Sequence, residues 1–211
     1  MKAPERIPSK YYNGYTMDGE VMLEYNYAND CSDEIQQLFN DNFKPEIFEE
    51  YLKKADNREE FYYGPTDMWL YEALEKYPIE GKDICIIGSA NPWYEAIAIS
   101  FGVNSCTVVE YSKRESFHDK ITYLQPHEIS KGNFDACFSI SSVEHDGLGR
   151  YGDPLDPDGD LKAMKNLKNF LKILTGWKTV DRFGFFSDSF TNNFNGVEGT
   201  PYQPVYILRK K

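Results

Sequence analysis

The chain is poor in cysteine, and its cysteines follow no disulfide or ligand pattern. Four are present in 211 residues, and no two of them have CxxC spacing. Cys85, Cys106 and Cys137 lie inside apolar runs, where a small thiol usually belongs to the core. We therefore expect free, buried thiols, because a chain of this length can bury a large core without a disulfide or a metal.

Long apolar runs and positive charge are also scarce. No stretch approaches the roughly 18 residues needed to span a bilayer, and residues 1–15 contain no apolar segment typical of a secretion signal. Twenty-three Lys and Arg residues against 34 Asp and Glu residues give a formal net charge of −11, which opposes attraction to nucleic acid or anionic membranes. These features predict a soluble, cytoplasmic protein that acts on a small molecule and binds neither nucleic acid nor membrane. The oligomeric state stays open.

What is present is an alternation of helical and strand-like segments. Residues 32–52 and 66–77 have apolar side chains at helical spacing. Residues 83–88, DICIIG, are almost wholly apolar, as in a strand covered on both faces, and a helix with Asn91 as its cap and Pro92 at its first position follows. The expected strands are 83–88, 106–109, 121–124 and 134–140. This order predicts an α/β fold with a doubly wound parallel sheet and helices on both faces.

The expected organisation is one compact unit in which an N-terminal arm with helices packs on a larger domain. We place the arm and its helices at 1–60 and the Rossmann-like domain at 61–211. An amphipathic helix over 160–174 follows the fourth strand, and 177–186 and 204–208 look like two strands joined by a polar loop. The apolar side chains of that helix are Leu161, Met164, Leu167, Leu171 and Leu174.

The loop after the first strand and the acid after the second point to a ligand site. Gly88, Ser89 and Ala90 precede a helix start, whose amides and dipole favour an anionic group. Glu110 ends the next strand, where an acid accepts hydrogen bonds from both hydroxyls of a ribose. A strand glycine followed about twenty residues later by such an acid favours an adenosine cofactor. The alternative is that Gly88 only turns the chain and Glu110 is a solvated acid.

A polar, glycine-rich loop follows the fourth expected strand. His145 is a candidate general base, and Glu144 or Asp146 beside it is placed to orient it. Arg150 offers paired donors for a carboxylate or phosphate. Residues 147–152, GLGRYG, match GxGxxG, but the prolines after them keep a helix from opening there, so we expect the glycines to let the loop fold over a ligand. A structural histidine is the alternative to a catalytic one.

Four acids after this loop raise the question of a divalent metal site, since hard cations take oxygen ligands. They are Asp153, Asp156, Asp158 and Asp160. The spacing does not fit an EF-hand loop, because Gly159 comes too early. Capping of the next helix by Asp158 or Asp160 is the stronger account. We therefore assign no metal ligand.

Parts of the chain resemble a family named domain of unknown function 268, best known from nematodes. The resemblance covers about residues 7–172 and is carried by the stretches IIGSANPWYEAIAISFG, TVVEYS and FSISSVEHDGLGRYGDPLDPDGDLKAM. That family is itself similar to Rossmann-like methyltransferases that use S-adenosylmethionine. The resemblance implies a methyltransferase-type sheet, with Gly88 in the cofactor loop, Glu110 on the ribose, and the segment from Ser141 to His145 beside the methyl group.

The chain departs from the methyltransferase pattern in two places. The pattern has an acid two residues before its first glycine and more glycines after it, where this chain has Ile86, Ala90 and Pro92. Similar proteins also carry a strand and a helix before the strand that starts at Trp177, where only a few residues stand here. The resemblance therefore implies a sheet that lacks one interior strand. The short junction near Leu174 fits either a shortened isoform or a gene-model product.

The leading functional hypothesis is an S-adenosylmethionine-dependent methyltransferase that acts on a small polar acceptor. In it His145 is the base and Arg150 holds an acidic part of the substrate. One alternative is a non-catalytic, methyltransferase-like module that binds a nucleotide, metabolite or protein in the same crevice, which the missing glycines and the shortened sheet favour. The other is a metal-assisted transferase that uses a nucleotide-linked sugar and the acids of 153–160.

Overall fold

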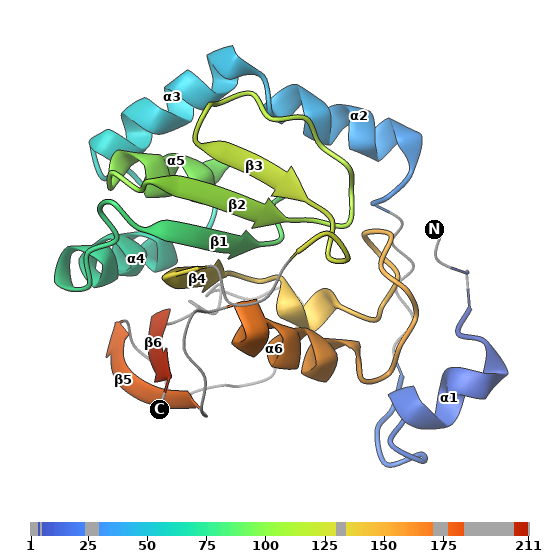
Figure 1. Cartoon of the computed structure of the whole chain (residues 1–211). Coiled ribbons are helices and arrows are strands. Elements are labelled where there is room, and N and C mark those ends of the chain that lie inside the picture. The colour runs from blue at the N-terminus through green and yellow to red at the C-terminus, as the bar shows by residue number, and fades with distance from the viewer. Residues whose placement is uncertain are drawn as a thin grey trace.

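Four parallel strands form the central sheet in the spatial order β3-β2-β1-β4 (Figure 1). The computed structural model describes residues 4, 6–23, 30–129, 134–170, 177–183 and 205–210. The strands are β1 (Asp83–Ile87), β2 (Ser105–Val109), β3 (Ile121–Leu124) and β4 (Ala136–Ser139). β1 pairs with β2 and β4, and β2 pairs with β3, all in parallel. The α/β fold with a parallel sheet is thus confirmed.

Helices cover both faces of this sheet (Figure 1). One face packs against α3 (Pro45–Asp56), α4 (Pro65–Lys76) and α5 (Trp93–Ser100), and the other packs against α6 (Gly159–Phe170). The other described helices are α1 (Ser9–Tyr15), α2 (Asp33–Asn42) and the single 3-10 turn η1 (Val143–His145). The cap of α5 differs from expectation: the helix begins at Trp93 with Pro92 as its N-cap, and no side chain caps it.

Coverage on both faces explains why β1 is apolar throughout. Ile84 and Ile86 point into the core beneath α3, α4 and α5, whereas Cys85 and Ile87 point into the core beside α6. All four side chains are buried, as a strand enclosed by helices requires. The cysteines are free: Cys85 and Cys106 are fully buried, and Cys31 and Cys137 are half-buried.

Helix α6 buries only part of its apolar side. Leu167 is buried against the sheet and Ala163 is partly buried there, but Leu161 is 65% exposed and Met164 is 39% exposed. Leu171 and Leu174 lie outside the described residues. Over its described length, α6 therefore meets the sheet along a narrower strip than its sequence pattern offers.

A second, antiparallel pair of strands lies next to α4 and does not join the central sheet. β5 (Trp177–Phe183) pairs with β6 (Val205–Lys210), and both approach α4. Among the described strands β4 pairs with β1 alone, so it forms an edge of the central sheet. No later strand of the described part occupies the place beside β4, where the resemblance implies a missing neighbour. The junction at 171–176 and the loop at 184–204 lie outside the described residues.

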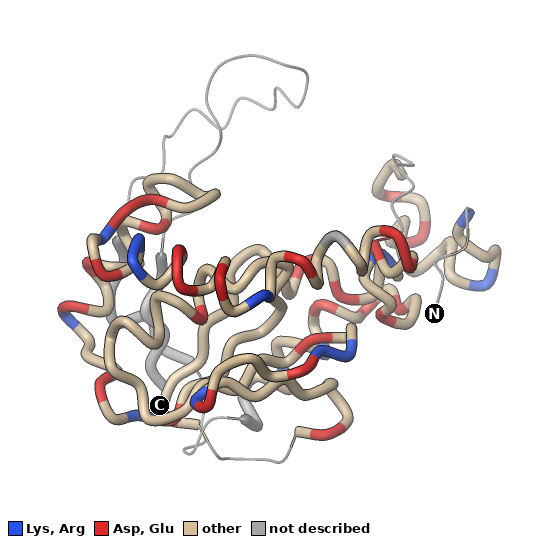
Figure 2. The backbone as a smooth tube through the Cα atoms, turned by 90° about the horizontal axis from the view of Figure 1, so that it is seen from above, with Lys and Arg blue, Asp and Glu red and all other residues tan. Residues whose placement is uncertain are grey.

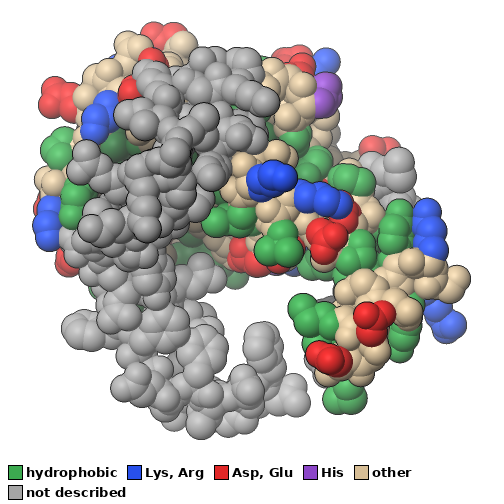
Figure 3. Space-filling model, turned by 60° about the horizontal axis from the view of Figure 1, so that its bottom comes forward, with side chains coloured by type: hydrophobic (Ala, Val, Ile, Leu, Met, Phe, Trp, Pro, Cys, Tyr) green, Lys and Arg blue, Asp and Glu red, His purple; other side chains and the backbone are tan. Residues whose placement is uncertain are grey.

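The N-terminal arm projects from the body and touches the loop before α6 (Figure 1). The Tyr15 hydroxyl donates a hydrogen bond to the carbonyl of Gly147, and Gly14 packs closely against Pro157. Several apolar side chains of the arm stay exposed, and hydrophobic atoms stand out on this projecting lobe in Figure 3. They are Tyr12, Met17, Val21 and Met22.

Acidic residues dominate the surface charge. Figure 2 shows acidic positions on all sides of the described backbone, with basic positions in short, separated stretches between them. This distribution accompanies the net charge of −11. Of the described helices, none has the length and apolarity that crossing a membrane demands.

Candidate functional site

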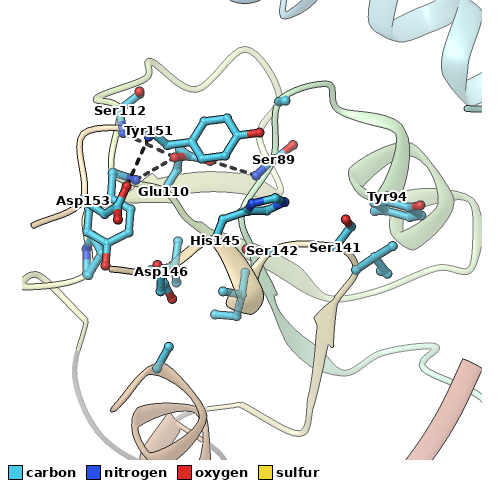
Figure 4. A pocket seen from close by; sticks show the side chains of 18 of the residues that line it. Ser89, Tyr94, Glu110, Ser112, Ser141, Ser142, His145, Asp146, Tyr151 and Asp153 are labelled. Carbon is cyan, nitrogen blue, oxygen red and sulfur yellow. Dashed lines mark hydrogen bonds between the residues drawn. The ribbon is translucent and has the colours of Figure 1, made fainter. Parts of the chain in front are cut away.

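A pocket opens at the carboxyl edge of the central sheet, where β1, β2 and β4 end (Figure 4). The carboxyl ends of parallel strands lie at one edge of the sheet, so loops that are distant in sequence meet there. Helices α2 and α6 supply further walls through Gln36, Phe39, Ala163 and Asn166. Every cofactor-site residue expected from the sequence lines this pocket. These residues are Gly88, Ser89, Ala90, Glu110 and Ser141.

The loop after β1 and the acid after β2 are joined directly. The backbone N–H of Ser89 donates to Oε2 of Glu110 at 2.9 Å, and the N–H of Tyr111 donates to Oε1 at 2.8 Å. The N–H of Ser112 lies 3.5 Å from the same Oε1. The Glu110 carboxylate is thus held in one orientation by backbone amides, and Figure 4 shows it at the wall of the pocket.

Gly88 is required by the approach of the β4 loop. Its φ is +73°, a conformation that favours glycine, and a Cβ atom built there would overlap the Ser142 hydroxyl and lie 2.9 Å from the Ser142 Cβ. The side chain that approaches Gly88 is therefore that of Ser142. This contact brings Ser141 and Ser142 beside the β1 loop, so the three strand ends enclose one space.

His145 lies in η1 and faces the pocket, with 28% of its side chain exposed. Its Nε2 is 4.0 Å from Oε1 of Glu144, which is beyond hydrogen-bond distance. Glu144 is 55% exposed and lies outside the pocket lining. The ring of Tyr151 packs edge-on against His145, with centroids 5.6 Å apart. The pocket therefore includes His145 but not Glu144.

Asp146 is the carboxyl group next to His145 that does reach the pocket. Burial raises the pKa of Asp146 to about 6, a hydrogen bond from the Tyr111 hydroxyl opposes that shift, and the nearby carboxylates of Asp153 and Glu110 add to it. Proximity in sequence marked this residue only as a possible neighbour of the histidine. Its contact with Tyr111 depends on how the loops after β2 and β4 meet.

Arg150 does not line the pocket. Its Nε donates to Oδ2 of Asp30 at 2.7 Å, and the backbone N–H of Asp30 donates to the carbonyl of Arg150 at 2.8 Å. The Arg150 guanidinium lies 5.0 Å from the centroid of the Tyr151 ring. Arg150 therefore ties the start of α2 to the glycine-rich loop.

Arg114 is the only Lys or Arg among the described residues that line the pocket. Its guanidinium lies 4.0 Å from the Phe43 ring centroid, and Nη1 donates to Oδ1 of Asn40 at 3.2 Å. Burial lowers the pKa of Arg114, while nearby Glu110 opposes that shift. The sequence offered no motif around Arg114, so only its place after β2 could have suggested it.

The GLGRYG loop closes around an acid of its own chain. Oδ2 of Asp153 accepts hydrogen bonds from the N–H groups of Gly147 and Gly149 at 2.8 and 2.7 Å, and Oδ1 accepts one from Tyr151 at 3.1 Å. Asp153 is 3% exposed. The glycines of this loop, which were expected to fold it over a ligand, instead wrap it around the Asp153 carboxylate.

The remaining acids of this segment, Asp156, Asp158 and Asp160, do not line the pocket. Asp156 pairs with Lys162 at 2.5 Å at the surface, and it accepts a hydrogen bond from the N–H of Asp158. Across the described residues, no group of three or more His, Cys, Asp or Glu side chains is arranged to hold a metal ion.

A fully buried acid lies beneath the loop after β1. Glu95 in α5 is 0% exposed, and its Oε1 accepts a hydrogen bond from the Tyr123 hydroxyl at 3.3 Å. Burial raises the pKa of Glu95 to about 7, although the Ser89 side chain lowers it through a hydrogen bond. Sequence reasoning passed over Glu95 because it stands in an apolar helical run.

Comparison with known proteins shows similarity to a family but no activity. No curated protein matches the chain. Residues 81–176, which contain β1 to β4 and the pocket loops that follow these strands, match the model of a family described as "Caenorhabditis protein of unknown function, DUF268". Over this stretch the chain is similar to that family, as its sequence stretches indicate.

Proposed function

We propose that the protein binds S-adenosylmethionine between the Gly88 loop and Glu110 and transfers its methyl group to a small polar acceptor. The observation that carries this proposal is the hydrogen bond from Ser89 to Glu110 at the edge of an open pocket. A backbone loop and a fixed carboxylate at neighbouring strand ends form an arrangement that suits the ribose of a nucleoside.

The fit of the residues to this ligand rests first on Glu110. Each carboxylate oxygen accepts about two hydrogen bonds. The amide of Ser89 uses one on Oε2, and the amides of Tyr111 and, at 3.5 Å, Ser112 use two on Oε1. Oε2 therefore keeps acceptor capacity for a ribose hydroxyl, and the carboxylate needs no reorientation to use it.

The charge of the pocket supports a cationic ligand. The pocket lining contains three carboxylates, those of Glu110, Asp146 and Asp153. Arg114 supplies the single guanidinium among the described lining residues. A sulfonium and an ammonium group are favoured in such surroundings, and a nucleotide phosphate is opposed. The amides of the glycine-rich loop, which would otherwise attract phosphate, are bonded to Asp153.

The residues of the chain have separate tasks in the proposed reaction. When bound, S-adenosylmethionine supplies the activated methyl group. Glu110 and the loop after β1 hold the nucleoside, since methyl transfer chiefly requires alignment of the reacting atoms. A ring nitrogen of His145 accepts the proton that the hydroxyl or amine of the acceptor loses. Glu144, which is 4.0 Å away and exposed, contributes only to the local charge.

A non-catalytic binding module is the second candidate. The gap between His145 and Glu144 favours it, because that carboxylate does not orient the imidazole. For the metal-assisted transferase, no described cluster of acids offers a site, and the negative pocket suits a nucleotide-linked sugar poorly.

Calorimetry with S-adenosylmethionine and its demethylated product tests the proposal. We expect both to bind the wild type, and Glu110→Gln to lower their affinity about tenfold or more, because hydrogen bonds to a charged acceptor are strong. Glu49→Gln, on the exposed side of α3, is the matched control and should bind as the wild type does. Absence of binding, or equal binding by Glu110→Gln at an unchanged melting temperature, would overturn the proposal.

A further inference from the structure

We infer that the ion pair between Asp30 and Arg150 positions the Tyr151 ring against the ligand pocket. The sequence suggested that Arg150 contacts substrate, but the structure assigns it a different partner. Arg150 is bonded twice to Asp30, through its side chain at 2.7 Å and its carbonyl at 2.8 Å. Arg150 is thus a positioning residue, because it reaches the pocket only through its neighbour.

Tyr151 is held between these contacts and the pocket. The Arg150 guanidinium lies 5.0 Å from the centroid of the Tyr151 ring, and the His145 ring packs edge-on against Tyr151 with centroids 5.6 Å apart. The Tyr151 N–H donates to Oδ1 of Asp153, which anchors the backbone below the ring. Figure 4 shows the Tyr151 ring near Glu110 and Ser89, where the proposed nucleoside binds.

The same ion pair connects two walls of the pocket. Asp30 precedes α2, and its carbonyl accepts a hydrogen bond from Nε2 of Gln36 at 2.6 Å. Gln36 and Phe39 of α2 line the pocket, as does Tyr151. A shift of Arg150 relative to Asp30 would therefore change the spacing between α2 and the aromatic ring. An aromatic ring in the wall of the pocket is suited to pack against the flat base or the ribose of a nucleoside.

Partial exposure of the ion pair distinguishes this role from a general contribution to stability. The ion pair is partly exposed, with 40% of the Arg150 side chain and 18% of the Asp30 side chain accessible. Such pairs add little to the free energy of unfolding. Its loss should therefore leave the melting temperature nearly unchanged while the position of the Tyr151 ring changes.

The first test reads the position of the ring without any ligand. The chain has three histidines, so the ring protons of His145 can be assigned by nuclear magnetic resonance with a His145→Gln variant. The variant Tyr151→Leu removes the ring, so it shows how far and in which direction the His145 signal shifts when the ring is absent. We expect Arg150→Gln to move the signal in the same direction, and the reversed pair Asp30→Arg with Arg150→Asp to move it back. His118, which packs against Phe48 at 5.6 Å, is the internal reference.

The second test reads ligand binding, and this part rests on the proposed function. Affinity for the demethylated product of S-adenosylmethionine should fall about tenfold in Arg150→Gln, because a misplaced aromatic wall loses contact with the ligand. The reversed pair should restore most of it. Reversal of the Asp156–Lys162 pair, an exposed ion pair outside the pocket, is the matched control and should change neither readout.

The outcomes separate the two proposals. A His145 signal in Arg150→Gln that coincides with the wild type overturns the positioning role, whether or not the ligand binds. If the His145 signal responds as expected and no S-adenosyl compound binds the wild type, the proposed function fails and the positioning role stands.

Discussion

Two glycine-containing loops lie at the same pocket, and their backbone amides have different partners. In the loop after β1, the amide of Ser89 is bonded to a carboxylate from the neighbouring strand end, Glu110, and the loop lines the cavity. In the loop of residues 147–152, the amides of Gly147 and Gly149 are bonded to Asp153, six and four residues ahead in the same loop. The first loop joins two strand ends, and the second encloses a charge of its own.

The difference shows what a glycine motif does and does not encode. GLGRYG matches a dinucleotide motif better than GSANP does, yet its amides already have an anionic partner. Glycine supplies backbone freedom, and amides that converge will bind whichever anion lies between them. Within the loop of 147–152 that anion is Asp153, so a phosphate would meet a negative charge there.

The largest expected effect concerns the closed loop. Gly147 has φ +96°, and a Cβ atom there would overlap the carbonyl oxygen of Asp156 and lie 3.1 Å from Cα of Gly159. Since the obstacle is backbone, we expect Gly147→Ala to lower the free energy of unfolding by about 4 kcal/mol. Gly19→Ala, with φ +94° and open space around it, isolates the conformational cost alone. Urea unfolding measures both, and equal losses would show that the loop can shift.

The acid at the centre of the closed loop should matter almost as much. Asp153→Asn keeps one acceptor oxygen but replaces the other with an NH₂ group. That group is a donor and faces backbone N–H groups that now donate to the carboxylate. Buried donors left without partners cost about 1–3 kcal/mol each, so we expect a loss of about 3 kcal/mol. Asp158→Asn, at an exposed position, should change stability little. A small effect of Asp153→Asn would mean that another acceptor can fill the loop.

The loop after β1 contacts a buried carboxyl group, that of Glu95, through the Ser89 side chain, and one oxygen of this carboxyl group lacks a donor. Oε2 of Glu95 has no hydrogen-bond partner, and burial raises the pKa of Glu95 to about 7. The folded protein keeps this proton at pH values where the unfolded chain has released it, so the stabilisation is complete below the unfolded pKa of 4.5 and is lost as the pH rises to about 7.

Linkage gives the size of this effect as roughly 3 kcal/mol. We expect Glu95→Gln to remove that part of the decline in unfolding free energy over this pH range. Chemical unfolding at several pH values measures it, with the exposed Glu72→Gln as control. If both variants follow the wild-type pH profile, Glu95 titrates as it does in water.

The smallest effect is expected at the open loop itself. Gly88→Ala introduces a Cβ at φ +73° that overlaps a side chain, that of Ser142, which can move. We expect a loss of about 2 kcal/mol, against about 1 kcal/mol for Gly81→Ala, where φ is +68° and no atom lies within 4 Å. Adding Ser142→Gly should recover the difference. Without such recovery in thermal or urea unfolding, the Ser142 contact would not explain Gly88.

Much of the fold was predictable from local pattern. The wholly apolar run of β1 implied helices on both faces, and its alternating side chains occupy the two cores. The approach of the Gly88 loop to Glu110 was also predictable, because a right-handed crossover makes consecutive parallel strands neighbours with their ends together. The expected methyltransferase activity stays a prediction.

Other parts depended on contacts between distant segments. Arg150 and Arg114 are both arginines in polar loops, and nothing local shows that Asp30 holds the first outside the pocket while Phe43 and Asn40 hold the second inside it. The apolar pattern of α6 likewise gave no sign that Leu161 would be exposed. The places of the two arginines depend on partners more than 70 residues away, which sequence spacing does not encode.

By itself, the order of residues determined the central strands, the helices from α2 to α6, and the placing of a glycine loop and an acid at one edge of a parallel sheet. These follow from side-chain period and chain connectivity, which act over short distances. Only the tertiary structure decided that Asp153 accepts the hydrogen bonds of the second glycine loop, that Asp146 lines the pocket, and that Arg150 pairs with Asp30. Hydrogen bonds and charges act between whichever groups folding brings within a few ångströms, and that proximity is a property of the packed chain.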